Sequence, residues 1–378
     1  MSLSWFLFLI VTIILLQGWI YKHWGLSGLT YTRTFSTSAV FEGEEAEMVE
    51  RIQNKKLLPI PWLQMESKMN PNLKFHRQSD LAIKYDEFHK SVFSLMPYTA
   101  ITRRHRILCE KRGCYRLSSA AMTCGDAFGI QELNRDFRVD AQLLVYPRLL
   151  PLSEIPFPSH SWMGEVAVRR WILEDPFLVS GVRDYQYGDP LNRISWKASA
   201  RTGAFKVYDR DHTADPHIMI LLNIDLSEGM WDAVTDPDRI ERGISYSATI
   251  AQNAIENGIP VGFGSNACEM DERNRPIRVG PQPGREQLNL ILEVLAKLIL
   301  VRSCTFFTFL EEELDRENPP ADILLITSFV SERMENQIAR LRDQGNSVDT
   351  IFLEGTTESD MTREPKKGFP EEAKGNAG

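Results

Sequence analysis

The stretch His217–Asp225, HIMILLNID, decides the fold of the second half of the chain. It is an almost continuous apolar run, which is typical of a strand buried on both faces of a sheet. Segments with helical spacing then alternate with further apolar runs: helices are expected over 239–258, 285–300 and 331–345, and strands over 259–264, 322–329 and 347–355. Strands that alternate with helices predict a mostly parallel α/β domain, here over residues 216–356.

The residues after this first strand are the place to look for a ligand, because open α/β sheets bind ligands beyond the carboxyl ends of their strands. The sequence there is DLSEG, from Asp225 to Gly229. It resembles the von Willebrand factor A family, whose metal-ion-dependent adhesion site opens with Asp-x-Ser-x-Ser. Asp225 and Ser227 match that motif, and Gly229 replaces its second serine.

The rest of that family's metal site is eroded in this sequence. Gly284 and Ser328 are the rough counterparts of its threonine and its second aspartate. Hard cations such as Mg²⁺ need several oxygen ligands, usually with more than one carboxylate. We therefore expect no cofactor, with Asp225 and Ser227 as the ligands of a degenerate Mg²⁺ site in the alternative case. Otherwise Asp225 caps or orients its own loop.

A second stretch of unusual composition, Gly181–Val207, combines many charged residues with aromatic ones. Its spacing predicts a helix over 190–202, with Asp189 as N-cap and Gly203 at the left-handed C-terminal position. Arg193, Lys197 and Arg201 would then form a basic stripe on one helix face. We expect Arg183, Arg193 and Arg201 to pair with Asp184, Asp209 and Asp211 beside a packed Trp196; the alternative is a stripe open to an acidic partner or an anion.

The N-terminus predicts a membrane anchor over residues 1–25. The segment Leu3–Ile20 is uncharged, and at ~1.5 Å per residue it nearly covers a bilayer core. A signal peptide is the alternative, but a basic leader and a small-x-small cleavage site are both missing. Lys22 and Arg33 follow the segment, so the positive-inside rule predicts one pass through the plasma membrane with the bulk of the chain in the cytoplasm.

Between the anchor and the α/β domain, residues 30–165 predict an immunoglobulin-like β-sandwich. Ala46, Met48 and Ile52 alternate toward one face, and short strands are separated by turn signals such as Arg112-Gly113. Residues 166–215 would link this sandwich to the α/β domain, and the tail 357–378 lacks an apolar period and is expected to be disordered. The fold class is therefore a multidomain α+β protein with a transmembrane helix. A net charge of -8 argues against a nucleic-acid partner.

The stretch around Asp189 also resembles a bacterial family, domain of unknown function 58. The positions that match this family are Arg183, Tyr185, Gly188, Asp189, Arg193, Trp196, Ser199, Ala200 and Arg201. Together with Lys197 they are expected to form one interaction or structural motif. The resemblance implies a membrane-bound adaptor that works with a MoxR-type AAA+ ATPase in envelope or stress functions. It also implies transglutaminase-like membrane proteins as neighbours, and no catalytic activity.

The residues themselves indicate no catalytic site, since no Ser/His/Asp or Cys/His arrangement, phosphate-binding glycine loop or paired carboxylates stand out. We therefore expect a non-enzymatic, membrane-anchored interaction protein. The alternatives are a metal-dependent adhesion or ligand-binding receptor and, after it, a hydrolase whose site is assembled from distant residues.

Overall fold

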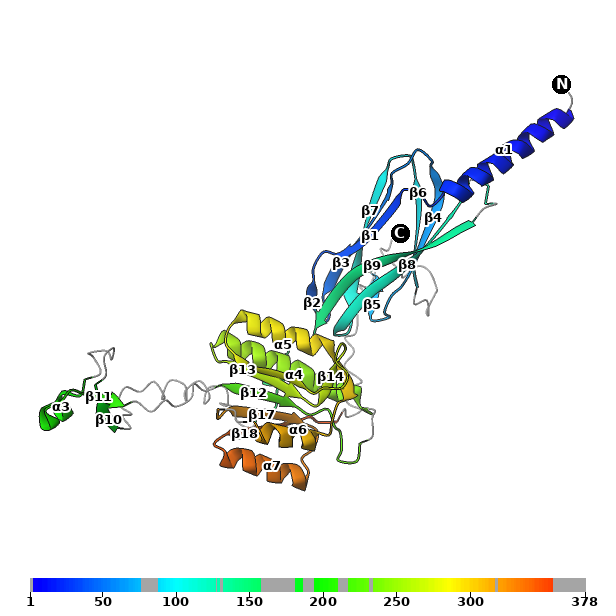
Figure 1. Cartoon of the computed structure of the whole chain (residues 1–378). Coiled ribbons are helices and arrows are strands. Elements are labelled where there is room, and N and C mark those ends of the chain that lie inside the picture. The colour runs from blue at the N-terminus through cyan, green and yellow to red at the C-terminus, as the bar shows by residue number, and fades with distance from the viewer. Residues whose placement is uncertain are drawn as a thin grey trace, which may run out of the picture.

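The computed structural model describes residues 3–75, 88–126, 128–129, 132–157, 181–185, 194–209, 217–230, 234–316 and 319–355. Within these ranges the chain forms an N-terminal helix, two facing β-sheets, a small two-stranded unit and an α/β domain (Figure 1). The tail 357–378 and most of the predicted link over 166–215 lie outside the described residues.

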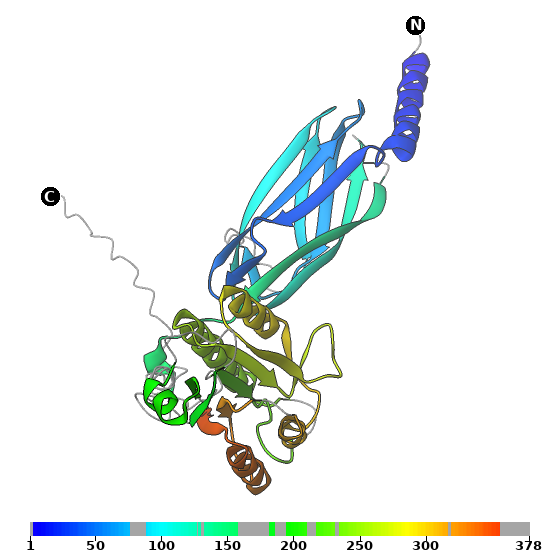
Figure 2. The ribbon, with the colours of Figure 1, turned by 60° about the vertical axis from the view of Figure 1, so that its left-hand side comes forward.

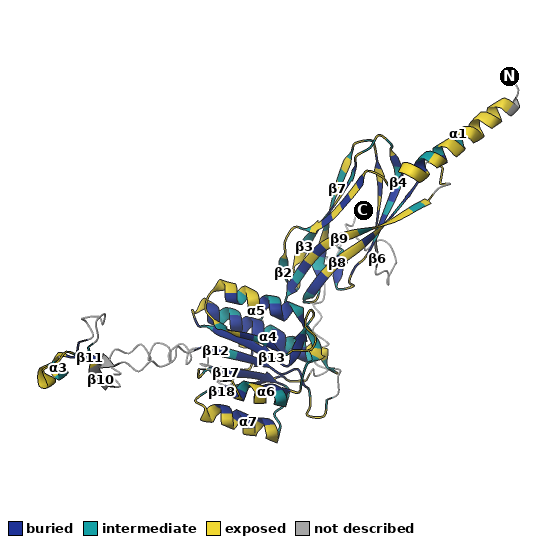
Figure 3. Cartoon of the chain, in the orientation of Figure 1, coloured by how far each residue is buried: buried dark blue, intermediate teal, exposed yellow. Residues whose placement is uncertain are grey.

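Helix α1 spans Leu3–Trp24, and most of its side chains are exposed (Figure 3). Its stretch Trp5–Trp24 is long and apolar enough to cross a membrane. An apolar surface of that size is unfavourable in water, whereas a bilayer core would cover it. The predicted N-terminal apolar helix is therefore present.

Two sheets follow α1 and enclose one core. Their strands are β1 Leu29–Phe35, β2 Ala39–Phe41, β3 Glu45–Asn54, β4 Ile60–Lys68, β5 Leu73–Phe75, β6 Phe88–Leu95, β7 Ala100–Cys109, β8 Gly113–Gly125 and β9 Glu132–Tyr146. One sheet has the order β1-β3-β7-β5 and the other β2-β9-β8-β4-β6. Met48 from the first sheet and Phe93 from the second pack in the same apolar cluster. The predicted alternation along β3 is confirmed, because Ala46, Met48 and Ile52 are all buried.

An ion pair lies inside this sandwich. Arg33 of β1 contacts Glu50 of β3, and both side chains are fully buried. Arg33 also donates to Ser67, while Tyr31 and Ser91 donate to the Glu50 carboxylate at 2.9 and 3.0 Å. Such a pair persists in a core only when further hydrogen bonds satisfy it. Arg33 therefore places no charge at a membrane surface. Of the two basic residues on which the predicted membrane orientation was based, only Lys22 still supports it.

The α/β domain is a five-stranded sheet with helices on both faces. Its elements are β12 Ile218–Leu222, α4 Pro237–Glu256, β13 Val261–Ser265, β15 Ile277–Gln282, α5 Arg285–Lys297, α6 Phe306–Leu314, β17 Asp322–Thr327, α7 Glu332–Asp343 and β18 Ser347–Phe352. The order is β15-β13-β12-β17-β18, in which β15 alone runs antiparallel. Helices α4 and α5 cover one face, and α6 and α7 cover the other (Figure 1).

Two details of this domain differ from the prediction. The helix expected over 285–300 ends at Lys297, because Leu298 is extended and opens strand β16, Leu298–Arg302. Strand β16 pairs with β14, Ala267–Glu269, in a separate two-stranded sheet. The β-branched Ile299 and Val301 favour this extended pairing over a further helical turn.

Arg112, in the turn before β8, joins the sandwich to the α/β domain. Its Nε and Nη2 atoms donate to the Glu241 carboxylate of α4 at 2.5 and 2.9 Å. Its Nη1 donates to the carbonyls of Leu295 and Leu298 at 2.7 and 2.8 Å, at the end of α5. The guanidinium group thus holds the ends of two helices of one domain from a turn of the other.

Replacing this side chain should loosen the contact between the domains. We expect Arg112→Ala to lower the free energy of unfolding by about 2–4 kcal/mol, because a carboxylate and two carbonyls lose their donor. The matched control is Arg116→Ala, which removes an exposed ion pair with Asp271 across the same boundary and should leave the midpoint close to that of wild type. Denaturant unfolding measures both, and equal midpoints for the two variants would contradict this role of Arg112.

Candidate functional site

Four buried polar side chains lie at the carboxyl edge of the parallel strands. Asn223 and Asp225 follow β12, Asn266 follows β13, and Thr327 ends β17. The Asn223 Nδ2 atom donates to Thr327 Oγ1 at 2.9 Å, and the Ile224 amide donates to Asn266 Oδ1 at 3.0 Å. This edge is where ligands of open α/β sheets bind, so it is the first candidate site.

Asp225 is bound on both carboxylate oxygens by groups of the protein itself. Its Oδ1 accepts from Asn266 Nδ2 at 3.1 Å, and its Oδ2 accepts from the Phe306 amide at 2.9 Å, at the first residue of α6. The Arg302 guanidinium lies 3.8 Å from Oδ1. Burial raises the pKa of Asp225, while the Phe306 amide and Arg302 act against that rise. Asp225 thus fixes the start of α6 and the end of β13 to the end of β12.

The other predicted ligand positions do not converge on Asp225 in this way. Ser227 and Gly229 are exposed, and Gly284 is the N-cap of α5 with a φ of 97°. Ser328 has a buried hydroxyl for which the structure shows no hydrogen-bond partner. Across the described ranges, no three His, Cys, Asp or Glu side chains are grouped to hold a metal ion. The arrangement favours the reading in which Asp225 orients its loop.

Sequence reasoning missed the partners of Asp225. Asn266 comes directly after the buried strand VGFGS, which is the same relation that singled out Asp225 after β12. That signal could have been used. Arg302 and the amide of Phe306 could not be found in this way, because α6 was not predicted and its approach to β12 depends on the tertiary fold.

The second candidate is the small unit formed by β10, Gly181–Asp184, α3, Trp196–Thr202, and β11, Lys206–Asp209. Strands β10 and β11 pair antiparallel, so that Arg183 lies opposite Val207. The predicted helix start is wrong: Ile194 forms a β-bridge with Val207, Ser195 is the N-cap, and α3 begins at Trp196. The predicted stop is confirmed, since Gly203 has a φ of 69°.

One motif residue of this unit binds backbone groups, and two others are exposed to solvent. Ser199 Oγ accepts from the Lys206 amide at 2.8 Å and donates to the Ser195 carbonyl at 2.9 Å, which fixes α3 to β11. Lys197 and Arg201 are exposed. Gly188, Asp189 and Arg193 lie outside the described residues, as does Asp211.

An aromatic surface stands beside these basic residues. Trp196 is 67% exposed and Phe205 59%, so the predicted packing of Trp196 is wrong. The Phe205 ring meets those of Trp196 and Tyr185 edge-on, each at a centroid distance of 6.3 Å. Asp184 pairs with Lys206 at 2.6 Å, which is not one of the predicted arginine partners. Trp196, Phe205, Lys197 and Arg201, called the aromatic–basic surface below, are therefore presented outward.

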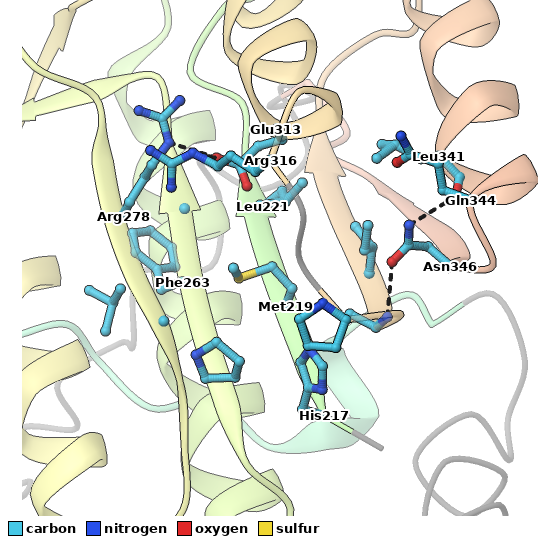
Figure 4. Close-up of a pocket in the computed structure, with 17 residues that line it drawn as sticks. His217, Met219, Leu221, Phe263, Arg278, Glu313, Arg316, Leu341, Gln344 and Asn346 are labelled. Carbon is cyan, nitrogen blue, oxygen red and sulfur yellow. Dashed lines mark hydrogen bonds and ion pairs between the residues drawn. The ribbon is translucent and has the colours of Figure 1, made fainter. Parts of the chain in front are cut away.

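A pocket of about 130 Å³ opens on the sheet face beside α6 and α7 (Figure 4). Met219, Leu221 and Phe263 form its apolar side. At one end Arg278 donates to Glu313 at 2.6 Å, and at the other Asn346 accepts from the Ala321 amide at 2.9 Å. The residues that line it include no serine, threonine or cysteine, so the pocket offers no hydroxyl or thiol nucleophile for the hydrolase alternative.

The part of the chain that holds both candidate sites is similar to a known protein family. Residues 181–362 match the family model described as "Protein of unknown function DUF58". The resemblance predicted from the motif around Asp189 is therefore found over this range. A curated relative, "Uncharacterized protein YeaD" of Bacillus subtilis (strain 168), is 21% identical over 361 residues, which cover 95% of this chain and 84% of the relative.

Solved structures give partial similarities. The CARDB domain of a Pyrococcus furiosus protein, in complex with di-metal ions, matches at 15% identity and a TM-score of 0.20, over 32% of this chain and 97% of its own. A non-cellulosomal cohesin from Archaeoglobus fulgidus matches at 9% identity and a TM-score of 0.21, over 31% and 91%. Similarities of that size do not establish a shared activity.

The role of Asp225 can be separated from that of a metal ligand. Asp225→Ala should lower the free energy of unfolding by about 2–4 kcal/mol, because the Phe306 amide and Asn266 lose their acceptor. Ser227→Ala, at an exposed position, should change it by less than ~0.5 kcal/mol. Thermal unfolding with and without millimolar Mg²⁺ measures both. A rise in the wild-type Tm with Mg²⁺ that both variants abolish would instead identify a metal site.

The raised pKa of Asp225 gives a pH signature. Because the folded protein binds this proton more tightly than the unfolded chain, the stability contributed is fully present below the unfolded pKa, ~4, and is lost as the pH rises through the folded value. The non-titrating Asp225→Asn variant lacks this dependence. The difference in unfolding free energy should therefore shift in favour of wild type as the pH falls toward ~4. A constant difference would contradict the assignment.

Proposed function

We propose that the chain is a membrane-anchored, non-enzymatic interaction protein whose docking element is the aromatic–basic surface. The observation that carries this proposal is the exposure of Trp196 and Phe205 beside Lys197 and Arg201. Large aromatic and arginine side chains dominate the binding energy of protein interfaces. The same groups left exposed to water would have no structural benefit.

The charge of this surface indicates the kind of partner. Lys197 and Arg201 lie four residues apart on α3 and therefore share a helix face. An acidic protein surface with an apolar pocket for the aromatic rings would complement them. The resemblance supports a MoxR-type AAA+ ATPase as that partner, with a transglutaminase-like membrane protein as a further component, in envelope or stress functions.

The architecture supports an adaptor more than the alternatives. Helix α1 would anchor the chain in the plasma membrane, with the sandwich and an α/β domain similar to von Willebrand factor A domains on the cytoplasmic side. A metal-dependent receptor is less well supported, because both Asp225 oxygens accept hydrogen bonds from the protein. A hydrolase is less well supported, because the polar groups of the pocket bind one another.

The proposal predicts that folding and association respond differently to the same substitutions. Trp196→Ala and the double variant Lys197→Glu/Arg201→Glu should each change the free energy of unfolding by less than ~0.5 kcal/mol, as exposed positions do. Each should abolish co-purification of the MoxR-type ATPase from detergent-solubilised membranes. The matched controls are Phe352→Ala and Arg333→Glu, at exposed positions of the α/β domain, which should retain the partner.

Two results would contradict this docking element. Retention of the ATPase by the Trp196 and charge variants would show that the association uses another surface. If these variants unfold at clearly lower denaturant concentration than the controls, the basic residues stabilise the fold, as the sequence predicted, and do not form the docking element.

A further inference from the structure

The last turns of α1 are fixed to one end of the sandwich. The Tyr21 hydroxyl donates to the Pro59 carbonyl at 2.9 Å, and Gln17 Nε2 donates to the Asp126 carboxylate at 3.2 Å. Lys56 Nζ donates to the carbonyls of Trp24, Gly25 and Ser27, the last at 2.7 Å. Lys56 thereby binds three carbonyls at and just after the C-terminal end of the helix.

Gly25 shows how close this contact is. A Cβ atom on Gly25 would lie 2.5 Å from the Tyr21 carbonyl oxygen and 2.8 Å from a methyl group of Leu133, at the start of β9. The helix and the sandwich therefore approach each other where no side chain fits between them. Figures 1 and 2 show α1 leaving the sandwich at the end where the β6–β7 and β8–β9 connections lie.

The loops at this end carry exposed apolar side chains. Leu57 lies between β3 and β4, Met96 and Tyr98 between β6 and β7, and Phe128 between β8 and β9, and they are 74, 66, 68 and 62% exposed. Tyr98 has a φ of 52°, a strained value for a residue with a side chain. We call these four residues the loop tips.

Two of these loops, β3–β4 and β6–β7, are tied to each other by hydrogen bonds. The Tyr98 amide donates to the Lys56 carbonyl at 3.2 Å. The Asn54 side chain donates to the carbonyls of Leu58 and Met96 at 2.9 and 3.1 Å. Lys56 is also the residue that binds the end of α1, so the same loop holds both the helix and the neighbouring tip.

Helix geometry sets the depth of this surface. The candidate span Trp5–Trp24 has 20 residues, and at ~1.5 Å per residue it is ~30 Å long, the thickness of a bilayer core. Gln17 lies seven residues before Trp24, and it contacts Asp126 two residues before Phe128. The loops that contact Gln17 and Tyr21 are thus level with the last ~10 Å of the span. If the span matches the bilayer core, that depth is the outer third of the acyl-chain region, next to its boundary with the headgroups.

We propose that the loop tips insert into this boundary, so that the sandwich is seated on the bilayer that α1 spans. Leu57, Met96, Tyr98 and Phe128 would bury their apolar surface among the upper acyl chains, as interfacial segments of monotopic proteins do. The exposed Lys22 and Lys55 lie beside them and favour anionic headgroups. This inference rests on the membrane-spanning α1 of the proposed function.

The test places an environment-sensitive fluorophore (NBD) on single cysteines of the full-length protein in phosphatidylcholine–phosphatidylglycerol vesicles. The parent is Cys304→Ala, since Cys304 is half-buried and the other four cysteines are buried. The labelled variants are Leu57→Cys, Met96→Cys and Phe128→Cys. Leu15→Cys reports the middle of the span Trp5–Trp24, and Leu290→Cys is the matched exposed apolar position on α5 of the α/β domain. Spin-labelled lipids carry the quencher on the headgroup, near the top of the acyl chain or deep within it.

We expect the three loop positions to show blue-shifted emission and strongest quenching by the headgroup and upper-chain labels. Leu15 should be quenched most by the deep label, and Leu290 by none. If the loop positions behave like Leu290 while Leu15 is quenched, the proposed insertion of the loop tips is wrong, although the membrane-spanning helix is supported. If Leu15 also escapes quenching, the membrane-spanning helix fails and this inference fails with it. Melting temperatures equal to that of the parent show that each labelled variant is folded.

Discussion

The architecture depends on one guanidinium group, that of Arg112, which binds two helix ends across the boundary between two separately built cores. The sandwich core and the α/β core share no strand, and their contact also includes the edge-to-face pair of Phe41 and Tyr146, 5.5 Å apart, against the α/β domain. The five donors of arginine lie in a fixed plane, so binding a carboxylate and two carbonyls fixes an angle as well as a distance. A lysine could supply the charge without that orientation.

Within the α/β domain the carboxyl edge of the sheet is organised by polar side chains. Asn223, Asp225, Asn266 and Thr327 bind one another and the start of α6. A buried network of this kind is stable only when each member has its partners, and here the Phe306 amide and Asn266 supply them for the Asp225 carboxylate. Each of these hydrogen bonds occupies a lone pair of Asp225 that would otherwise be open to a ligand.

The sequence predicted those elements whose conformation depends mainly on neighbouring residues in the chain. The apolar runs around Ile218, Val261 and Ile323, the helical spacing of α4 and α7, and the left-handed Gly203 depend on neighbouring residues, and the structure contains them all. The start of α3 could not be predicted in this way, because Ile194 is held by Val207 from β11. Arg33 reads as a charge near the membrane until Glu50, from the next strand of the same sheet, is placed beside it. Exposure of Trp196 likewise depends on what the tertiary fold leaves uncovered.

The sandwich also acts as a spacer of defined height. Strand β9 has 15 residues, so at ~3.3 Å per residue it is ~50 Å long, and it runs from the α1 end of the sandwich to the α/β domain. Both ends of the sandwich are fixed by hydrogen bonds: Lys56 binds the end of α1, and Arg112 binds α4 and the end of α5. If α1 spans a bilayer, as proposed, the α/β domain is confined to a thin layer parallel to that bilayer. A partner embedded in the same membrane would then have to project by a similar height to meet it, whereas a freely diffusing partner would reach it without crossing the headgroups.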